Sequence, residues 1–294
     1  MFNIYEEITN RILAEMEKGI IPWQKPWTCS CGAVSHTTGH PYSLLNQILL
    51  MMDDDNDDTE QLSVKEYLTF NQIKAAGGSI KKGEKSKFVV FWKMYEKERE
   101  NENGDKTKDV IPLLRYYHVF EVGQCDGIKR KWSQEKQQIP DPIDEADVVV
   151  KTYFDREACR LHIHETNRAY YSPSQDLVNV PQLSQYKVAG EYYSTLFHEM
   201  THSTGHQTRL DRLSVGNMNF GSDAYSREEL VAELGSAFLL NKVGIDCKSA
   251  FRNSVAYLQG WSEALKNDRN LFVSAASKAE AAINYIINGK EVSK

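Results

Sequence analysis

The pattern of hydrophobic and polar residues changes along the chain and divides it into segments of different kinds. Apolar side chains recur every four residues from Ile4 to Met16, which indicates one face of an amphipathic helix. Residues 88–92 and 113–122 are rich in β-branched and aromatic residues, so both are predicted to be strands.

The pattern of the second half begins as strands and ends as helices. Residues 148–154 and 161–166 are predicted to be strands, and residues 169–181 to be two short strands around a Ser-Pro turn. From Glu191 onward the spacing of apolar residues is mostly helical.

Polar segments separate these elements. The acidic residues 53–60 read as a solvated surface loop, and residues 96–109 as a long hairpin loop between two strands. Residues 133–147 carry two prolines and few apolar residues, and are predicted to be a linker. The sequence therefore predicts an α+β fold with two domains, residues 1–132 and 148–294.

Composition restricts the class of protein further. The chain has 294 residues, 41% of them hydrophobic and 26% charged, as in globular proteins that fold in water. We expect neither a membrane span nor a signal peptide, because no apolar run is long enough and the first residues lack a basic leader. Five cysteines do not make a disulfide framework and suit a reducing cytoplasm. The oligomeric state is not indicated.

The segment Phe197-His-Glu-Met-Thr-His-Ser-Thr-Gly-His predicts a metal site. On a helix, His198 and His202 lie one turn apart on one face, so both imidazoles can reach one zinc ion. Another divalent transition metal is possible on the same ligands. Glu199 follows the first ligand and can take a proton from the attacking water. Gly205 is expected to end the helix in a left-handed conformation.

The third ligand is sought further along the chain. A third histidine could return to the metal after Gly205, but the position that this spacing requires holds Thr208, so His206 is expected to cap the helix or contact substrate. A helix is expected from Ser226, with Glu229 at capping-box spacing. Glu233 borders its apolar stripe and is our expected ligand, with Glu229 as a group behind the ligands or an alternative ligand.

A second cluster of metal-binding residue types occurs near the N-terminus. Cys29, Cys31, His36 and His40 have suitable side chains for zinc. The single residue between the cysteines is a tighter spacing than usual, so a loop is the favoured interpretation and zinc binding a weak alternative.

Positive charge and aromatic residues are concentrated in the first half of a chain whose net charge is −6. Residues 74–93 contain six lysines and a single acid, Glu84, which gives this segment a net charge of +5. Proteins that bind single-stranded DNA typically place lysine and arginine side chains along the phosphate backbone of the DNA, beside aromatic side chains that stack on its bases. The candidate residues are Trp23, Lys25, Trp27, Lys81, Lys82, Lys85, Lys87, Trp92, Tyr116 and Tyr117.

Several long segments resemble, in the same order, the antirestriction proteins of the ArdC type. The resemblance is carried by residues 8–27, 37–50, 67–93, 113–127, 169–181, 192–212 and 225–240. The chain departs from the family in its acidic run, in residues 96–109 and at His40.

The resemblance implies an N-terminal domain that binds single-stranded DNA and a C-terminal zincin-like metallopeptidase domain. It also implies protection of incoming DNA from host restriction by a protein of mobile elements or phages. It carries over His198, Glu199 and His202, and it supports a glutamate from the following helix. The substrate peptide is not indicated. The alternative function is a DNA-binding shield whose zincin-like half is a scaffold without peptidase activity.

Overall fold

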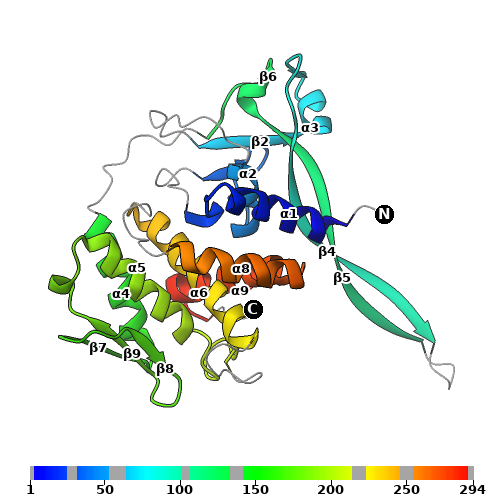
Figure 1. Cartoon of the computed structure of the whole chain (residues 1–294). Coiled ribbons are helices and arrows are strands. Elements are labelled where there is room, and N and C mark those ends of the chain that lie inside the picture. The colour runs from blue at the N-terminus through cyan, green and yellow to red at the C-terminus, as the bar shows by residue number, and fades with distance from the viewer. Residues whose placement is uncertain are drawn as a thin grey trace.

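The structure, a computed structural model, describes residues 3–24, 32–52, 64–100, 106–132, 142–213, 223–245 and 254–290. It has an α+β architecture with an N-terminal and a C-terminal part (Figure 1). The N-terminal elements are α1 (Ile4–Glu17), η1 (Pro22–Gln24), β1 (Ala33–Ser35), α2 (Leu44–Met52), β2 (Lys65–Thr69), α3 (Phe70–Ala75), β3 (Ser79–Ile80), β4 (Lys87–Glu100), β5 (Lys106–Glu121), η2 (Val122–Gln124) and β6 (Cys125–Asp126). The C-terminal elements are α4 (Pro142–Arg156), β7 (Arg160–His164), β8 (Tyr170–Ser172), β9 (Leu177–Pro181), η3 (Leu183–Gln185), α5 (Ala189–Ser203), α6 (Asp223–Val243), α8 (Ser254–Asn267) and α9 (Leu271–Asn288).

The N-terminal part is built on a four-stranded sheet with the order β1-β2-β5-β4. The pair β1–β2 is parallel and the other two pairs are antiparallel. Helix α2 is tied to β4 by Asn46, whose amide accepts from the Val90 N–H at 2.7 Å and donates to the Val90 carbonyl at 2.8 Å. The expected strands at residues 88–92 and 113–122 are thus confirmed as the start of β4 and the end of β5, although β5 ends one residue earlier, at Glu121.

The hairpin of β4 and β5 is longer than the sequence predicted. Its register runs from Lys87 opposite Val119 to Glu100 opposite Lys106, so the interpretation of residues 96–109 as a loop is wrong for 96–100 and 106–109. The register places Lys97 opposite Asp109 and Glu98 opposite Lys108. Figure 1 shows this hairpin reaching away from the rest of the molecule.

The C-terminal part contains a three-stranded sheet with the order β7-β9-β8. Strand β9 is parallel to β7 and antiparallel to β8, so it is the central strand of the sheet. Leu177, Val178 and Val180 on this strand are buried. The expected strands at residues 161–166 and 169–181 are confirmed, with boundaries that differ by a few residues.

Residues 148–154 form part of helix α4, so the prediction of a strand there was wrong. The helix begins at Pro142, which places residues 142–147 of the expected linker in its first turns, whereas residues 133–141 lie outside the described residues. Proline is favoured at the start of a helix because its missing N–H has no helical partner there. Ala146, Val150 and Tyr153 are buried at helical spacing, and this tertiary packing outweighs the β preference of three consecutive valines.

The main core runs through both parts of the molecule. The expected N-terminal helix is confirmed as α1, whose buried face packs against α8 and α9. The indole of Trp23 lies 5.5 Å, between ring centroids, from both Trp261 and Phe272. Figure 1 shows α8 and α9 between α1 and the α4–α5 layer. Within the described part of the chain, no helix combines the length and hydropathy that a membrane span requires.

Candidate functional site

Helix α5 presents the two histidines predicted to bind a metal. Its buried face, which includes Phe197 and Met200, holds the helix in the core. His198 and His202 lie one turn apart, and their Nε2 atoms face each other at 3.1 Å. Their side chains are 18% and 13% exposed, so both rings are accessible to an ion while their backbone is fixed.

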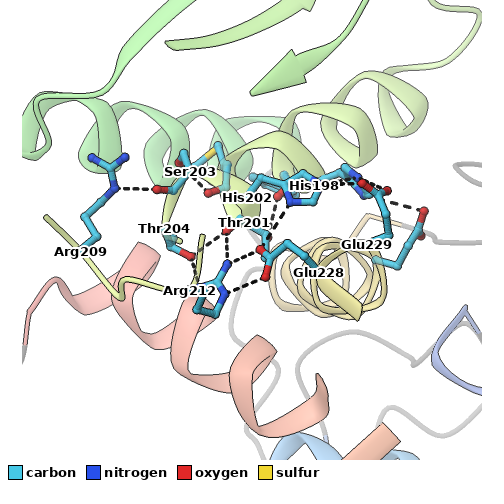
Figure 2. A network of polar contacts seen from close by, with 12 residues as sticks. His198, Thr201, His202, Ser203, Thr204, Arg209, Arg212, Glu228 and Glu229 are labelled. Atoms are coloured by element: carbon cyan, nitrogen blue, oxygen red, sulfur yellow. Dashed lines mark hydrogen bonds and ion pairs between the residues drawn. The ribbon is translucent and has the colours of Figure 1, made fainter. Parts of the chain in front are cut away.

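Glu229 on α6 completes a group of three ligand atoms (Figure 2). Its two carboxylate oxygens lie 3.4 Å from His198 Nε2 and 3.4 Å from His202 Nε2. Two ligands at about 2.0–2.1 Å from a tetrahedral ion are separated by about 3.3–3.4 Å. The two imidazole nitrogens lie 3.1 Å apart and each faces a different oxygen of Glu229 at 3.4 Å, so the three residues are close enough together to hold one metal ion.

The structure places Glu233 behind His198, away from the group of ligand atoms. Its Oε1 lies 3.7 Å from His198 Nδ1, the ring nitrogen on the side opposite to Glu229, and its Oε2 has no hydrogen-bond partner among the described residues. This geometry does not support our expectation that Glu233 is the third ligand. Helix α6 begins at Asp223, so Ser226 lies inside the helix and the expected capping box with Glu229 is wrong.

The close approach of α5 and α6 brings these groups together. A Cβ atom at Gly235 would lie 2.6 Å from Cγ2 and Oγ1 of Thr201, which is fully buried on α5. The Ser236 hydroxyl donates to the Ser194 carbonyl at 2.7 Å and adds a second connection between the helices. A glycine at the crossing therefore allows the glutamates of α6 to reach the histidines of α5.

The histidines and glutamates of the site form a set of coupled charges. Burial alone would lower the pKa of His202, but hydrogen bonds to Glu228 and Glu229 outweigh burial and raise this pKa to about 10. The pKa of His198 is also raised, because contact with Glu229 outweighs burial. Burial opposes ionisation of Glu229, yet the two histidines hold its pKa below the ordinary value. The pKa of Glu233 is raised, chiefly by burial.

Glu199 and His206 occupy different positions relative to the histidines. Glu199 is 8% exposed on α5. His206 lies outside the group of ligand atoms, and its Nδ1 is 2.9 Å from the Thr208 hydroxyl. Helix α5 ends at Ser203, and Gly205 does not have a positive φ, so the predicted left-handed helix end is wrong. Gly205 instead allows close packing, because a Cβ there would lie 2.8 Å from Leu213 Cγ.

Sequence reasoning missed two polar residues beside His202. Glu228 is buried, and its Oε1 lies 3.5 Å from His202 Nδ1. Arg212 forms an ion pair with Glu228 at 2.7 Å. The adjacent pair Glu228–Glu229 gave a weak signal of a second carboxylate at the site, but no sequence pattern pointed to Arg212.

The predicted DNA-binding residues are in several different environments. Trp23 is 1% exposed and is a core residue, so its prediction as a base-stacking residue is wrong for this structure. Lys25 and Trp27 lie outside the described residues. Lys82 and Lys85 are exposed. The ammonium groups of Lys81 and Lys87 donate to the carbonyls of Gly123 and Leu50 at 2.6 and 2.9 Å.

The remaining aromatic candidates lie on opposite faces of the β4–β5 hairpin. The register places Val90 opposite Tyr116 and Trp92 opposite Leu114, so Trp92 and Tyr116 share one face. The other face, which we call the Phe91 face, consists of the exposed residues Phe91, Lys93, Tyr95, Leu113, Arg115 and Tyr117. Sequence analysis selected only Tyr117 on this face, because composition does not reveal which side chains share a surface.

The weak alternative of a second zinc site falls partly outside the described residues, which do not include Cys29 and Cys31. His36 is buried, and its Nδ1 lies 2.5 Å from Oε2 of the buried Glu66. His40 is exposed. The carboxylate of Glu66 also accepts hydrogen bonds from the backbone of Lys131 and Trp132. His36 is therefore already part of a network that anchors the end of the N-terminal part.

The His-Glu-x-x-His helix, the crossing helix with its glutamates and the adjacent sheet define a zincin-like protein with an additional N-terminal α+β part. Two family descriptions match the chain in agreement with this class. Residues 149–278 match the zincin-like metallopeptidase family, and residues 2–120 match the N-terminal domain of the anti-restriction factor ArdC. The chain belongs to the ArdC antirestriction family.

Two solved structures agree with this assignment, and curated proteins are similar to nearly the whole chain. The metal-free crystal structure of the antirestriction ArdC protein from plasmid R388 is 33% identical, with a TM-score of 0.72 and 97% of each chain covered. Its Mn(II)-bound structure is 31% identical, with a TM-score of 0.74 and full coverage of both chains. An uncharacterized protein, y4eC, of Sinorhizobium fredii is 30% identical over 97% of this chain and 91% of its own length. A DNA primase TraC of Escherichia coli is 30% identical over 96% of this chain, which spans only 27% of that primase.

Proposed function

We propose that this protein binds single-stranded DNA with its N-terminal part and carries a metal-dependent peptidase site in its C-terminal part. Together these activities would protect incoming DNA from restriction in a bacterial cytoplasm. The observation that carries the proposal is the arrangement of His198, His202 and Glu229, whose ligand atoms lie 3.1–3.4 Å apart beside the buried Glu199. A scaffold without chemistry has no need of that glutamate.

His198, His202 and Glu229 are the proposed metal ligands. Two imidazoles and a carboxylate suit zinc, and other divalent transition metals bind such ligands as well. The related ArdC protein was crystallised with Mn(II). A bound divalent metal supplies Lewis acidity that polarises a scissile carbonyl. Glu199 would accept the proton of the attacking water and pass it to the leaving amine, as a general acid–base.

The geometry of the sheet indicates where a peptide could bind. Strand β9 is central and both of its edges are occupied by neighbouring strands, so no peptide can add to it. Strand β8 is an edge strand in contact with α5, so a substrate could add to β8 through backbone hydrogen bonds. The Tyr171 hydroxyl donates to Asp176 at 2.8 Å and is not free to assist a reaction, whereas Tyr170 is exposed on the same strand.

The isosteric substitution Glu199→Gln tests the peptidase. We expect zinc binding to persist and turnover of a fluorogenic casein substrate to fall by about 10²–10⁴-fold, the usual contribution of a general base. Glu165→Gln, at an exposed position after β7, is the matched control. The peptidase assay is run with and without single-stranded DNA. Protection from restriction is measured separately in cells. Protection that survives in Glu199→Gln would favour the DNA-binding shield over proteolysis.

The Phe91 face is the proposed DNA-binding surface. The rings of Phe91 and Tyr117 are 45% and 48% exposed, and their centroids lie 5.7 Å apart. Exposed Lys93 and Arg115 lie on the same face and could contact phosphates between stacked bases. On the opposite face, Phe88 and Leu114 pack against the main core, and Arg11 of α1 lies over the Phe88 ring at 4.7 Å. That face is partly covered by α1.

Alanine substitutions on the two faces test this surface. Phe91→Ala and Tyr117→Ala should each weaken binding of an oligo-dT by about 1–3 kcal/mol, the contribution of one stacked base. Trp92→Ala removes an equally exposed aromatic from the opposite face and should change the affinity by less than about twofold. Arg115→Ala should reduce the salt dependence of binding by about 0.7 in log–log slope. A larger effect from Trp92→Ala would place the DNA on the other face.

A further inference from the structure

A buried polar cluster lies on the side of His202 that faces away from His198 (Figure 2). The Nε2 of His202 faces His198 and Glu229, and its Nδ1 lies 3.5 Å from Oε1 of Glu228. The Glu228 side chain is 7% exposed. Glu228 and Glu229 are consecutive on α6, so one helix supplies a carboxylate to each ring nitrogen of the same histidine.

Arg212 holds Glu228 through both carboxylate oxygens. Its Nη2 donates to Oε1 at 2.7 Å and its Nε donates to Oε2 at 3.2 Å. A forked contact of this kind fixes the plane of a carboxylate as well as its charge. Both side chains are nearly buried, at 8% and 7% exposed, so water competes little for either partner.

Arg212 is in turn fixed to the end of α5. It donates to the Thr201 carbonyl at 2.9 Å and to the Thr204 hydroxyl at 2.8 Å. The chain after α5 folds back tightly, since the Leu213 N–H donates to the Gly205 carbonyl at 3.0 Å. The arrangement therefore connects the last turn of the histidine helix to Glu228 on α6 through a single guanidinium.

We propose that Glu228, held by Arg212, is a positioning residue that keeps the proton of His202 on Nδ1 and directs the Nε2 lone pair toward the metal. This inference rests on the proposed metal site. A carboxylate that accepts from one ring nitrogen of a histidine leaves the other nitrogen as the ligand and fixes the ring orientation. His198 has a less constrained partner, because Glu233 lies 3.7 Å from its Nδ1 and Oε2 of Glu233 has no partner among the described residues.

The substitution Glu228→Gln tests the tautomer directly. If the glutamine oxygen remains with Arg212, its amide donates toward Nδ1 and moves the imidazole proton to Nε2. We expect zinc affinity, measured by competition with a chromophoric chelator, to fall about 10–100-fold, as for other groups that orient metal-binding histidines. Arg212→Lys keeps the positive charge but cannot contact both oxygens of Glu228 in the same way, so zinc affinity should fall by a smaller factor. Glu263→Gln, at an exposed position on α8, should match the parent.

Two further measurements separate positioning from folding. Melting in excess chelator reports whether each variant folds without metal, and the visible absorption of the Co²⁺-substituted protein reports the ligand geometry. The proposal expects an altered Co²⁺ spectrum in folded Glu228→Gln and Arg212→Lys. Zinc affinity within twofold of the parent in both variants, with an unchanged spectrum, would overturn it. A parent protein that binds no zinc would refute the metal site itself, together with this inference.

Discussion

Three glutamates of α6 meet the two histidines of α5 at different ring nitrogens. Glu229 lies between the two Nε2 atoms, Glu228 lies beside Nδ1 of His202, and Glu233 lies beside Nδ1 of His198. On the assignment that we propose, the metal takes the two Nε2 lone pairs, so Glu229 is the glutamate that shares the ion with both rings. In this proposal the other two carboxylates orient the rings.

Removal of each carboxylate should therefore have a different cost in metal affinity. Glu229→Gln removes a ligand, so we expect zinc affinity to fall by more than the about 10–100-fold that is typical of groups behind the ligands. Glu233→Gln should stay within that range. Isothermal titration with Zn²⁺ measures both. A larger loss in Glu233→Gln would restore Glu233 as the third ligand.

A second residue-scale network supports the segment that follows α5. Arg209, whose side chain is 1% exposed, pairs with Asp176 in the turn between β8 and β9 and donates to the Ser203 carbonyl at 2.7 Å. Burial opposes ionisation of Asp176, but hydrogen bonds from Arg209 and Tyr171 hold its pKa below the ordinary value. This pair therefore stabilises the fold above about pH 4 and loses its effect as pH falls through the lowered pKa.

Asp176→Asn tests this network, because asparagine tolerates the positive φ of 46° at this position. At pH 7 we expect a loss of about 3–5 kcal/mol in unfolding free energy, since Arg209 is left buried without its counter-charge. The difference from the parent should shrink below about pH 4, where Asp176 is protonated in the unfolded chain, and disappear once the pH falls below its lowered pKa in the folded protein. Urea unfolding of the parent and the variant at pH 7 and pH 3.5 measures this difference in unfolding free energy. Asp155→Asn, in an exposed pair with Lys151, should cost under about 1 kcal/mol.

The sequence and the structure point to the same candidate metal site, to within one helical turn. His198 and His202 were found because their spacing places both on one helix face whatever the tertiary structure. The choice between Glu229 and Glu233 could not be made in this way, because residues four apart share a face and only the packing of α6 on α5 separates them. Trp23 was misassigned for a similar reason, since burial depends on α8 and α9, which lie far away in the sequence.

At the scale of elements, the crossing of α5 and α6 determines whether the site forms. Gly235→Ala should cost about 1–3 kcal/mol of stability through overpacking, because Thr201 is fully buried and has little room to move. The gain of about 1 kcal/mol in helix propensity offsets only part of this. Displacement of α6 should also weaken zinc binding. In the Gly235→Ala variant, the further substitution Thr201→Ala removes both clashing atoms and should restore zinc affinity. A double-mutant cycle measures this coupling. Additive losses would contradict this account.

Helices and strands were predicted correctly where the sequence pattern of a segment agrees with its packing in the fold, as in α1 and the strands of the C-terminal sheet. The wrong predictions fall on segments where the sequence pattern and the packing favour different structures. Three consecutive valines favour a strand, yet in α4 they follow Pro142 and the helix buries Val150 against the core. Residues 96–109 look like a polar loop, but β4 and β5 continue through most of them. Cross-strand register cannot be read from one strand alone.

At the scale of the whole molecule, the two family-matched parts share one hydrophobic core. Helices α1 and α2 pack against α8 and α9, and the segment with Trp23 contacts α6, the helix that carries Glu229. The N-terminal part therefore supports the metal site physically, whatever it binds. The main core crosses the family boundaries at residues 120 and 149, although smaller clusters lie within the N-terminal part alone.

We therefore expect the chain to unfold in a single transition. Trp23→Ala should remove about 3–5 kcal/mol, the usual cost of truncating a buried tryptophan, and should lower the urea midpoint of backbone circular dichroism and of zinc release together. Trp23→Phe keeps an aromatic ring and removes an indole N–H that has no partner among the described residues, so it should cost less. Trp92→Ala deletes a tryptophan that is 48% exposed and should shift neither midpoint appreciably. Zinc retained at urea concentrations that have already unfolded the N-terminal part would show that the two parts fold independently.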